Sequence, residues 1–494
     1  MTRIEIGRRV HTGTKGKGTV RWIGLLEGLD SVRAGIELDS SNPSCHSGDY
    51  NGVQYFESPA QCGVFLKLDK VDEGFSVREA AELKYRTKDS DNQSSELVGQ
   101  AKAEQYFADN LFDLREFGLD EMAVSHIGDG LEVFSRLEKL SLRYTLLSSL
   151  RDVQELSTQI PTLRELDVSG NRFVRSYTGS TVLGLTRLVM NECVFACTSD
   201  LNRLLSETES LRFLSLNGVQ LDWEQLKLPS SLVGFSAQSV GLASWRQIMR
   251  ITEGLTHLES LDMSENTRLG DLDDPSVLPA SLKTFNISNC GISSWCSIKN
   301  IAARLPNLTS LKLTGNSVYE EVRGGPQRQL LVAVFSKLEI LNNATVSATQ
   351  RIEAERYIVS LLVKSGNAHW IRDALSEDRI EQLVSQYGQA SAKEDTADNT
   401  GSTSRRQRMT YAVSLKLPTG GIAALKVPIH CQLSDLRTIV AKRTSWPFKL
   451  SEMNIFFSPS ITGEDRIELE GGSEVDDLGI SDGWFMHVSL SDSD

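Results

Sequence analysis

Leucines recur at fixed intervals through the middle of this chain, with polar residues between them. The frame L-x-x-L-x-L-x-x-N/C-x-L fits the segments that begin at Leu163, Leu185, Leu282 and Leu308. Weaker copies begin at Leu137, Leu211, Leu232 and Leu258. Successive units therefore lie about 21–30 residues apart, too short to bury an apolar face alone. The period predicts a solenoid in which neighbouring units stack and share one core.

Each position of this frame has a physical reason. Alternate leucines point one face of a short strand into the shared core. Asn171 and Asn316 follow the strand, where their amides can bond turn backbone groups that burial would leave unpaired. Cys193 and Cys290 occupy the same turn position, and we interpret them as packing residues. The frame is that of leucine-rich repeats, and we expect an α/β solenoid with its C-terminal cap over residues 113–365.

A cap is expected because the last repeat would otherwise expose core to water. Ser347 and Gln350 have the spacing of a capping box, and helical patterning continues from there to about Tyr387. The segment from Gly388 to Met409 is polar and has almost no aliphatic bulk, so we expect a tether that stays flexible. Residues 366–408 are thus predicted to be a helical extension and flexible linker.

Residues 409–494 alternate apolar and polar positions again. "YAVSLKL" and "IAALKVP" predict a β-hairpin, and Leu436, Ile439 and Val440 fall on one face of a helix. Strand-like "MNIFF", "RIELE" and "WFMHVSL" follow. This order resembles the α+β ubiquitin-like β-grasp fold. The final residues carry no Gly-Gly tail, so we expect a recognition domain rather than a conjugated modifier.

The first 72 residues contain short β-patterned runs between regularly placed glycines, which predicts a small, strongly bent sheet. The motifs "GTVRWIG", "GIELD", "NGVQYF" and "GVFLK" occur in the order of the CAP-Gly domain, which this segment resembles. Residues 73–112 are expected to connect it to the solenoid and to be partly helical. The chain is therefore predicted to be multidomain.

The CAP-Gly resemblance implies a groove for acidic, aromatic C-terminal tails such as that of α-tubulin. Aligning on Tyr55 and Phe56 places Cys45 where the family has a lysine. A charge lost there could be replaced by a nearby cation, with Arg33, Lys15, Lys17 and Lys67 as candidates. The alternative is a groove kept for structure or for another ligand. The candidate groove residues are Trp22, Arg33, Cys45, His46, Asn51, Phe65 and Lys67.

The concave strand face of the solenoid is the second candidate surface, because residues flanking the second leucine of each frame point away from the core. This face is polar, rich in serine and mixed in charge. It suits a protein-binding trough, although a merely solvated strand face looks the same. The candidate contact residues are Arg143, Asp167, Arg187, Phe213, Asp262 and Lys312.

Composition narrows the class of protein. The chain has 494 residues, 40% of them hydrophobic, and a formal net charge of −13, which argues against nucleic acid as a partner. No apolar run is long enough to cross a bilayer, and the charged first residues lack a secretory pattern, so we expect no membrane association and a cytoplasmic location. The seven cysteines show no metal-ligand spacing and are expected to be reduced.

No sequence pattern nominates an active site. The segment "GTKGKGT", from Gly13 to Thr19, lacks the spacing of a phosphate-binding P-loop and leads into a strand rather than a helix. The histidines are dispersed, without an acid-base cluster. We therefore expect a protein that is not an enzyme and has no cofactor or metal.

CAP-Gly, leucine-rich-repeat and ubiquitin-like segments in this order resemble the tubulin-folding cofactor E family of tubulin-specific chaperones. The resemblance implies binding to α-tubulin and the α/β-tubulin dimer, together with tubulin-folding cofactors B, C and D. It also implies a part in folding, assembly and dissociation of that dimer, and association with the cytoskeleton and microtubules. The alternatives are a microtubule-end adaptor and a leucine-rich-repeat GTPase-activating protein, in which Arg143 or Arg187 would act on a nucleotide complex.

Overall fold

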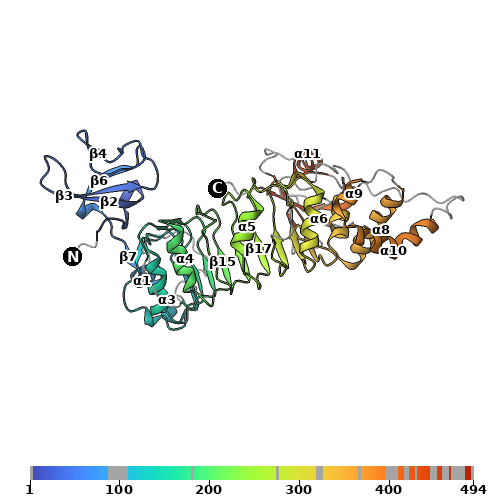
Figure 1. The fold of residues 1–494 in the computed structure, drawn as a ribbon. Coiled ribbons are helices and arrows are strands. Elements are labelled where there is room, and N and C mark those ends of the chain that lie inside the picture. The colour runs from blue at the N-terminus through green and yellow to red at the C-terminus, as the bar shows by residue number, and fades with distance from the viewer. Residues whose placement is uncertain are drawn as a thin grey trace. The chain divides into compact units, whose positions relative to one another are not determined.

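The computed structural model describes most of the chain, in segments that are separated by gaps. They are residues 4–86, 109–177, 179, 183–273, 278–318, 326–364, 369–394, 410–416, 422–428, 431–444, 453–458, 467–468, 475 and 484–490. The chain forms two compact units, Met1–Val240 and Gly241–Asp494, whose helices and strands are labelled in Figure 1. The boundary between these units falls inside the predicted solenoid, and the predicted domain boundaries stay predictions.

The first unit begins with a four-stranded antiparallel sheet in the order β1-β2-β3-β6. Its strands are β1 (Arg9–His11), β2 (Lys17–Leu25), β3 (Val32–Leu38) and β6 (Gly63–Lys67), with turns of 3-10 helix at η1 (Gly13–Lys15) and η2 (Leu68–Lys70). β4 (Asp49–Tyr50) and β5 (Val53–Gln54) form a separate hairpin. Val10, Val20 and Ile36 are fully buried in the core of this sheet. The predicted small β domain is confirmed.

A short parallel pair joins this sheet to the repeats. β7 (Phe75–Ser76) pairs with β9 (Val124–His126), and α1 (Val77–Arg86) follows β7 directly. The Ser76 hydroxyl accepts the backbone N–H of Glu79 at 3.2 Å, and the Glu79 carboxylate accepts the backbone N–H of Ser76 at 2.8 Å, which are the reciprocal bonds of a capping box at the start of α1. α1 lies in the segment that was predicted to be partly helical.

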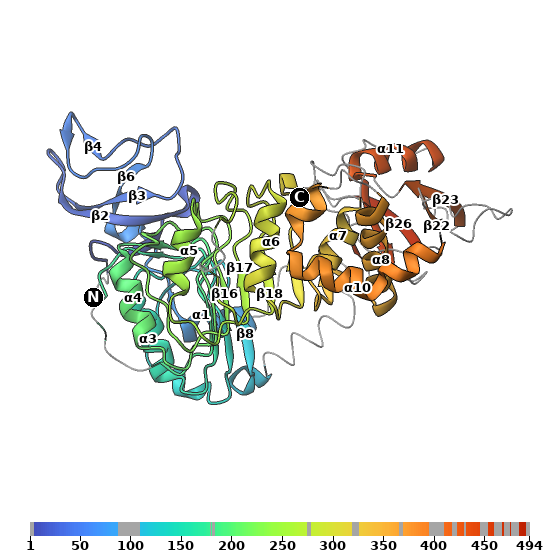
Figure 2. The ribbon, with the colours of Figure 1, turned by 45° about the vertical axis from the view of Figure 1, so that its right-hand side comes forward.

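Parallel strands of three residues, one from each repeat, form the sheet of the solenoid in the first unit. These strands run in the order β8 (Glu116–Gly118), β10 (Lys139–Ser141), β11 (Glu165–Asp167), β13 (Arg187–Val189), β15 (Phe213–Ser215) and β16 (Gly234–Ser236). The central residue of every strand is buried, as the frame predicted. α3 (Leu150–Gln159) and α4 (Thr198–Ser206) pack side by side along the stack (Figure 2).

Shorter elements complete these repeats. β12 (Arg172–Phe173) pairs in parallel with β14 (Val194–Phe195). Single turns of 3-10 helix occur at η3 (Leu111–Asp113) and η4 (Leu131–Val133). α3 starts at a complete capping box, in which the Ser149 hydroxyl and the Asp152 carboxylate accept backbone hydrogen bonds. This cap fixes the first turn of α3 next to the preceding strand.

The second unit continues the repeat pattern with strands β17 (Ser260–Asp262), β18 (Thr284–Asn286), β19 (Ser310–Lys312) and β20 (Ile340–Leu341), which pair in parallel. β21 (Ala344–Thr345) turns back on β20 as an antiparallel partner. The helices of these repeats are α5 (Trp245–Thr252), α6 (Trp295–Arg304) and α7 (Gln327–Val334). The reversal at β21 ends the ladder.

Helices cap the last strand. They are α8 (Ala348–Lys364), α9 (His369–Ala374) and α10 (Glu377–Glu394). The predicted capping box is confirmed, because Ser347 and Gln350 exchange hydrogen bonds of 3.0 and 3.2 Å between side chain and backbone. Glu355 is buried between these helices, where its carboxylate accepts from Arg379 at 2.7 Å and from the Tyr387 hydroxyl at 2.9 Å.

The prediction of a flexible tether from Gly388 onward is wrong for the first residues of that segment. α10 runs to Glu394, so the sequence "GQASAKE" continues the helix beyond Tyr387. Alanine, glutamine, lysine and glutamate have high helix propensity, which outweighs the polar composition of this stretch. The rest of the predicted tether, residues 395–409, lies outside the described residues.

The side chains at the turn position of the repeat frame form hydrogen bonds with backbone carbonyl groups, as predicted. The Asn171 amide donates to the carbonyl oxygens of Leu142 and Val168, at 2.8 Å each. The Asn316 amide makes the equivalent pair of bonds at 2.8 Å. Cys193 and Cys290 are buried at this position, and the thiol of Cys193 donates to the Val168 carbonyl. Burial raises the pKa of both thiols to about 12, which keeps them protonated and inert.

The C-terminal segment forms a five-stranded sheet in the order β23-β22-β26-β24-β25. Its elements are β22 (Thr410–Lys416), β23 (Ile422–Pro428), α11 (Leu433–Thr444), β24 (Met453–Ser458), β25 (Ile467–Glu468) and β26 (Phe485–Leu490). β22 and β26 are parallel, and the other pairs are antiparallel. Leu436 and Val440 of α11 are buried in the core of this sheet, which confirms the predicted hairpin and helix.

Candidate functional site

A row of residues across three strands forms the floor of the candidate site. Trp22 of β2 pairs with Gly35 of β3, which pairs with Phe65 of β6. A bulge between Val20 and Trp22 turns the Trp22 side chain to the face that Gly35 and Phe65 share. The sheet therefore brings two of the predicted groove residues, Trp22 and Phe65, together.

Five further rings surround Phe65, and we call the set the Phe65 cluster. Its members are Trp22, His46, Tyr50, Tyr55, Phe56 and Phe65. The ring centre of Phe65 lies 4.8 Å from His46 and 5.4–5.7 Å from Phe56, Tyr55 and Trp22. Tyr50 stands at 6.3 Å, and most of these contacts are edge-to-face. Phe56 is buried and the other rings are partly exposed, so the cluster presents a rigid aromatic surface.

Two glycines allow this packing. A Cβ atom on Gly35 would lie 2.6 Å from the ring of Phe56, so only glycine lets the ring rest on the strand. Gly48 has a φ of +97°, and a Cβ there would lie 1.9 Å from the carbonyl oxygen of Phe56. Gly48, within the segment "SCHSGDYNGVQYF", therefore allows close backbone approach as well as a turn.

His46 is fixed by its backbone and by its ring. Its backbone exchanges hydrogen bonds of 3.0 and 2.6 Å with Gly63 of β6. Nδ1 accepts the N–H of Gly48 at 2.9 Å, which assigns the ring proton to Nε2. Burial lowers the pKa of His46, Lys15 lowers it further, and Asp49 opposes both. The imidazole is therefore neutral near pH 7 and stacks on Phe65 as an uncharged ring.

Lys15 reaches the loop that carries Cys45 and His46. Its ammonium group donates to the Ser44 hydroxyl at 3.2 Å and to the Cys45 sulfur at 3.4 Å. The side chain comes from η1, a turn closed by the Thr12 hydroxyl, which donates to the Gly16 carbonyl at 2.7 Å. The residue that replaces the family lysine thus has the ammonium group of another lysine beside it.

Other predicted groove residues lie around the cluster. Arg33 and Lys67 are register partners two residues along their strands from Gly35 and Phe65, on the same face. Asn51 has a φ of +50° in the tight turn between β4 and β5, where it is exposed. The participation of these three residues in ligand binding stays a prediction.

Charged residues join the N-terminal sheet to the first repeats. Asp39 binds the buried Arg9 within its own domain and Arg172 of the solenoid at 3.2 Å. Glu5 pairs with Arg175 at 2.8 Å, and the Lys17 ammonium donates to the backbone carbonyl of Tyr144. Within the first unit, the N-terminal domain and the repeats are thus connected by directed polar contacts.

The concave strand face of the first unit is polar and internally paired. Arg143 forms two hydrogen bonds of 2.8 and 2.9 Å with Asp120. Burial opposes ionisation of Asp120, but the bonds from Arg143 and Ser141 outweigh it and lower the pKa of that carboxyl group. Arg187 lies 4.7 Å above the ring of Phe213, which is 38% exposed. This face therefore offers an aromatic and a cation that contact one another.

In the second unit, the predicted face residues Asp262 and Lys312 are half-buried on β17 and β19. The Asp262 carboxylate accepts from Asn286 at 2.9 Å and from the Ser264 hydroxyl at 2.7 Å. Asp262 is thus part of a polar ladder across neighbouring strands. Its contact with a partner protein stays a prediction, as does that of Lys312.

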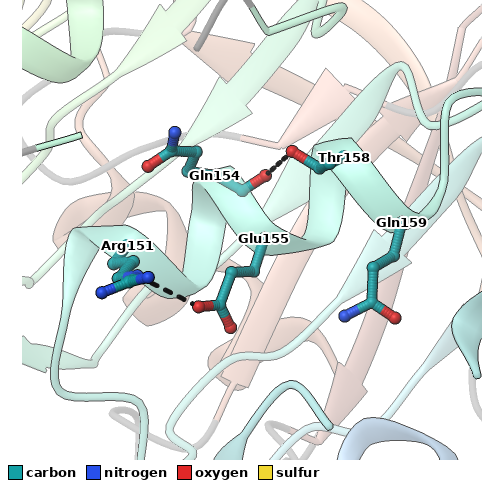
Figure 3. A pocket seen from close by; sticks show the side chains of 5 residues that line it. All are labelled: Arg151, Gln154, Glu155, Thr158 and Gln159. Atoms are coloured by element: carbon teal, nitrogen blue, oxygen red, sulfur yellow. Dashed lines mark hydrogen bonds and ion pairs between the residues drawn. The ribbon is translucent and has the colours of Figure 1, made fainter. Parts of the chain in front are cut away.

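A shallow hollow of about 240 Å³ lies on the outer face of α3. Figure 3 shows its lining residues, Arg151, Gln154, Glu155, Thr158 and Gln159, which all project from this one helix. Arg151 and Glu155 pair at 3.2 Å one turn apart, as residues on a solvated helix do. The lining carries no nucleophile beside a base, so this hollow offers no reaction chemistry.

Among the residues that the structure describes, no cluster of histidine, cysteine and acidic side chains is arranged to hold a metal ion. No helix in the same part of the chain combines the length and apolar character that crossing a bilayer requires. No disulfide joins any of the seven cysteines, which all lie in the part of the chain that the structure describes.

Sequence reasoning missed part of the site. Tyr55 and Phe56 were used only to align the motif and Tyr50 was not singled out, yet all three belong to the cluster. Lys15 was one of four candidate cations, and no sequence signal singled it out. The glycine-rich segment "GTKGKGT" holds two of the four candidates, Lys15 and Lys17, and only the fold shows that Lys15 contacts the Cys45 loop.

Comparison with known proteins agrees with this geometry. Residues 6–71 match the family model of the CAP-Gly domain, and residues 254–272 match a leucine-rich-repeat model. Tubulin-folding cofactor E of Arabidopsis thaliana is 24% identical over 446 residues, covering 80% of each chain. Tubulin-specific chaperone E of Drosophila melanogaster is 25% identical over 293 residues, about half (54%) of each chain.

A solved structure of the Bik1 CAP-Gly domain with an ETF peptide from Bim1 is 27% identical, covers 13% of this chain and 78% of that chain, and has a TM-score of 0.13. The family matches show an N-terminal CAP-Gly domain followed by leucine-rich repeats, and 80% of this chain is similar to tubulin-folding cofactor E of Arabidopsis thaliana.

Proposed function

We propose that this chain is a tubulin chaperone that binds α-tubulin and takes part in folding, assembly and dissociation of the α/β-tubulin heterodimer. The observation that carries this proposal is the Phe65 cluster with the Lys15 ammonium group beside it, inside a CAP-Gly domain. An aromatic surface next to a cation suits a peptide that ends in acidic and aromatic residues. Similarity to tubulin-folding cofactor E along most of the chain supports tubulin as the source of that peptide.

The repeats would contact the folded body of tubulin. The Arg187–Phe213 pair supports this role, because exposed arginine and aromatic side chains are frequent anchors of protein interfaces. A tail site and a body site on one chain would act together, because the first contact raises the effective concentration of the second. The protein's partners would include tubulin-folding cofactors B, C and D, and it would act in the cytoplasm in association with the cytoskeleton.

We further infer that residues 409–494 form a ubiquitin-like domain. The strand order β23-β22-β26-β24-β25 supports this inference, because a hairpin, a parallel central pair and one helix are the parts of a β-grasp sheet. The core contributed by α11 supports it as well. This domain would help to separate the subunits of the tubulin dimer.

Titration of the full chain with α/β-tubulin tests the proposal. Intact tubulin and tubulin without its α-tail would be compared, with complex formation and dimer dissociation followed together. We expect binding that weakens when the tail is removed, together with dissociation of the dimer. Equal binding of both forms would refute the tail site and leave the repeats as the contact. Failure of intact tubulin to bind would refute the chaperone function.

A further inference from the structure

The Lys15 ammonium group is held next to the Phe65 cluster by neutral partners. Arg9 and Arg21 of the same domain pair with the carboxylates of Asp39 and Glu37. The hydrogen-bond partners of Lys15, in contrast, are the Ser44 hydroxyl and the Cys45 sulfur. Lys15 is a half-buried residue without a carboxylate partner among the described residues, so its ammonium group can form a charge-assisted hydrogen bond with an anion.

The geometry at Lys15 leaves a donor for such an anion. The Ser44 hydroxyl donates its own hydrogen to the Asn42 side chain at 2.8 Å, so it meets Lys15 as an acceptor. An ammonium group has three donors, and these two contacts use two of them. The η1 turn carries Lys15, and both partners of its ammonium group belong to the Cys45 loop. The third N–H of Lys15 is therefore available to a ligand without a rearrangement of these contacts.

His46 supplies a second donor one residue from Cys45. Its Nδ1 accepts from Gly48, so its ring N–H is at Nε2. The same ring stacks on Phe65 at 4.8 Å, which joins the Lys15 loop to the aromatic surface. A carboxylate that contacts this loop would thus lie beside the rings that an aromatic residue of the same peptide would contact.

We propose that Lys15 is the cation that binds a carboxylate of the peptide at the Phe65 cluster, in place of the lysine that Cys45 replaces. This inference rests on the proposed function and deepens it, because it names the residue that determines specificity for an acidic peptide. The carboxylate is either the C-terminal one or that of an acidic side chain next to the aromatic residue.

Binding of a fluorescent peptide ending in Glu-Glu-Tyr to the full chain tests this assignment, with the same peptide as a C-terminal amide beside it. Lys15→Ala should weaken binding of the free acid about tenfold or more, as loss of one charge-assisted bond predicts. Lys70→Ala removes an exposed lysine of the same domain and should leave binding unchanged. Cys45→Lys added to Lys15→Ala should restore affinity, because it returns the cation to the same loop.

The amide separates the two sources of the carboxylate. If Lys15 binds the C-terminal carboxylate, the amide weakens binding to the wild-type chain but not to Lys15→Ala. If it binds a side-chain carboxylate, both chains respond equally to the amide. Wild-type binding that Lys15→Ala leaves unchanged would overturn the assignment of Lys15 alone. A wild-type chain that binds neither peptide would overturn the tail site itself.

Discussion

Asp39 and Arg172 form an ion pair of 3.2 Å between the N-terminal sheet and the solenoid. The same carboxylate neutralises Arg9, whose side chain is only 3% exposed. Asp39 therefore has two tasks: it pairs with Arg9 inside its own domain, and it pairs with Arg172 between two parts of the first unit. Two substitutions separate these tasks.

Asp39→Ala should lower the free energy of unfolding by roughly 1.5–3 kcal/mol, because it leaves the buried Arg9 guanidinium without its charged acceptor. Arg172→Ala should cost less than about 1 kcal/mol, because its pair with Asp39 is partly exposed and screened. Urea unfolding of the full chain measures both. Arg172→Ala should nevertheless speed amide hydrogen exchange of the backbone around Tyr144, whose carbonyl accepts from the Lys17 ammonium group at the same junction. Equal unfolding energies for the two variants would show that Arg9 does not depend on Asp39.

Gly35→Ala should destabilise the N-terminal domain. The added Cβ would lie 2.6 Å from the Phe56 ring and force the Phe65 cluster to move. Overpacking of this kind costs about 1–3 kcal/mol. Thermal unfolding should occur at a lower temperature than in the wild-type chain, and the peptide should bind more weakly. Gly118→Ala is the matched control, because its Cβ meets only ordinary contacts, the nearest at 3.4 Å. A Gly35→Ala chain with wild-type stability and peptide affinity would contradict the close packing of the cluster.

Asn171→Ala should be more damaging than Cys193→Ala, although both residues occupy the same turn position of a repeat. The Asn171 amide donates hydrogen bonds to two buried carbonyl groups, whereas the Cys193 thiol donates to one. An unsatisfied buried polar group costs about 1–3 kcal/mol, so we expect a difference of that size in urea unfolding. A smaller loss for Asn171→Ala than for Cys193→Ala would show that the amide bonds are not what stabilises this turn.

Asp152 should make stability depend on pH. Burial raises the pKa of its carboxyl group from 3.8 to about 7, although the N–H of Ser149 opposes this shift. Between these values the folded chain binds more protons than the unfolded chain, so the free energy of unfolding should fall as the pH rises from about 4 to about 7.

Asp152→Asn keeps an acceptor for the capping box and cannot ionise. Urea unfolding across this pH range should therefore lose its slope in the Asp152→Asn chain. Asp200→Asn, in the first turn of α4, is the control and should retain the slope. An unchanged slope in the Asp152 variant would assign the pH dependence to other groups.

Parts of the candidate site could be predicted and parts could not. Trp22, His46 and Phe65 were predicted from motifs, and the structure brings their rings together. The choice of Lys15 among four candidate cations could not be made, because 29 residues separate it in sequence from Ser44, and only the folded loops bring them within 3.2 Å. The continuation of α10 past Tyr387 was missed, because polar residues with high helix propensity resemble a linker in composition.

The sequence by itself determined the repeat architecture. The leucine frame fixes which side chains of each strand are buried, and Asn171 and Asn316 at the turn position each bond a carbonyl three residues earlier. Such information is local and periodic, so it can be read from spacing. Tertiary structure alone decided that Gly35 lies beneath Phe56, that Lys15 reaches Cys45 and that Asp39 binds Arg172. These contacts join residues far apart in the chain, and their geometry depends on how sheet, loops and repeats pack, which no local pattern encodes.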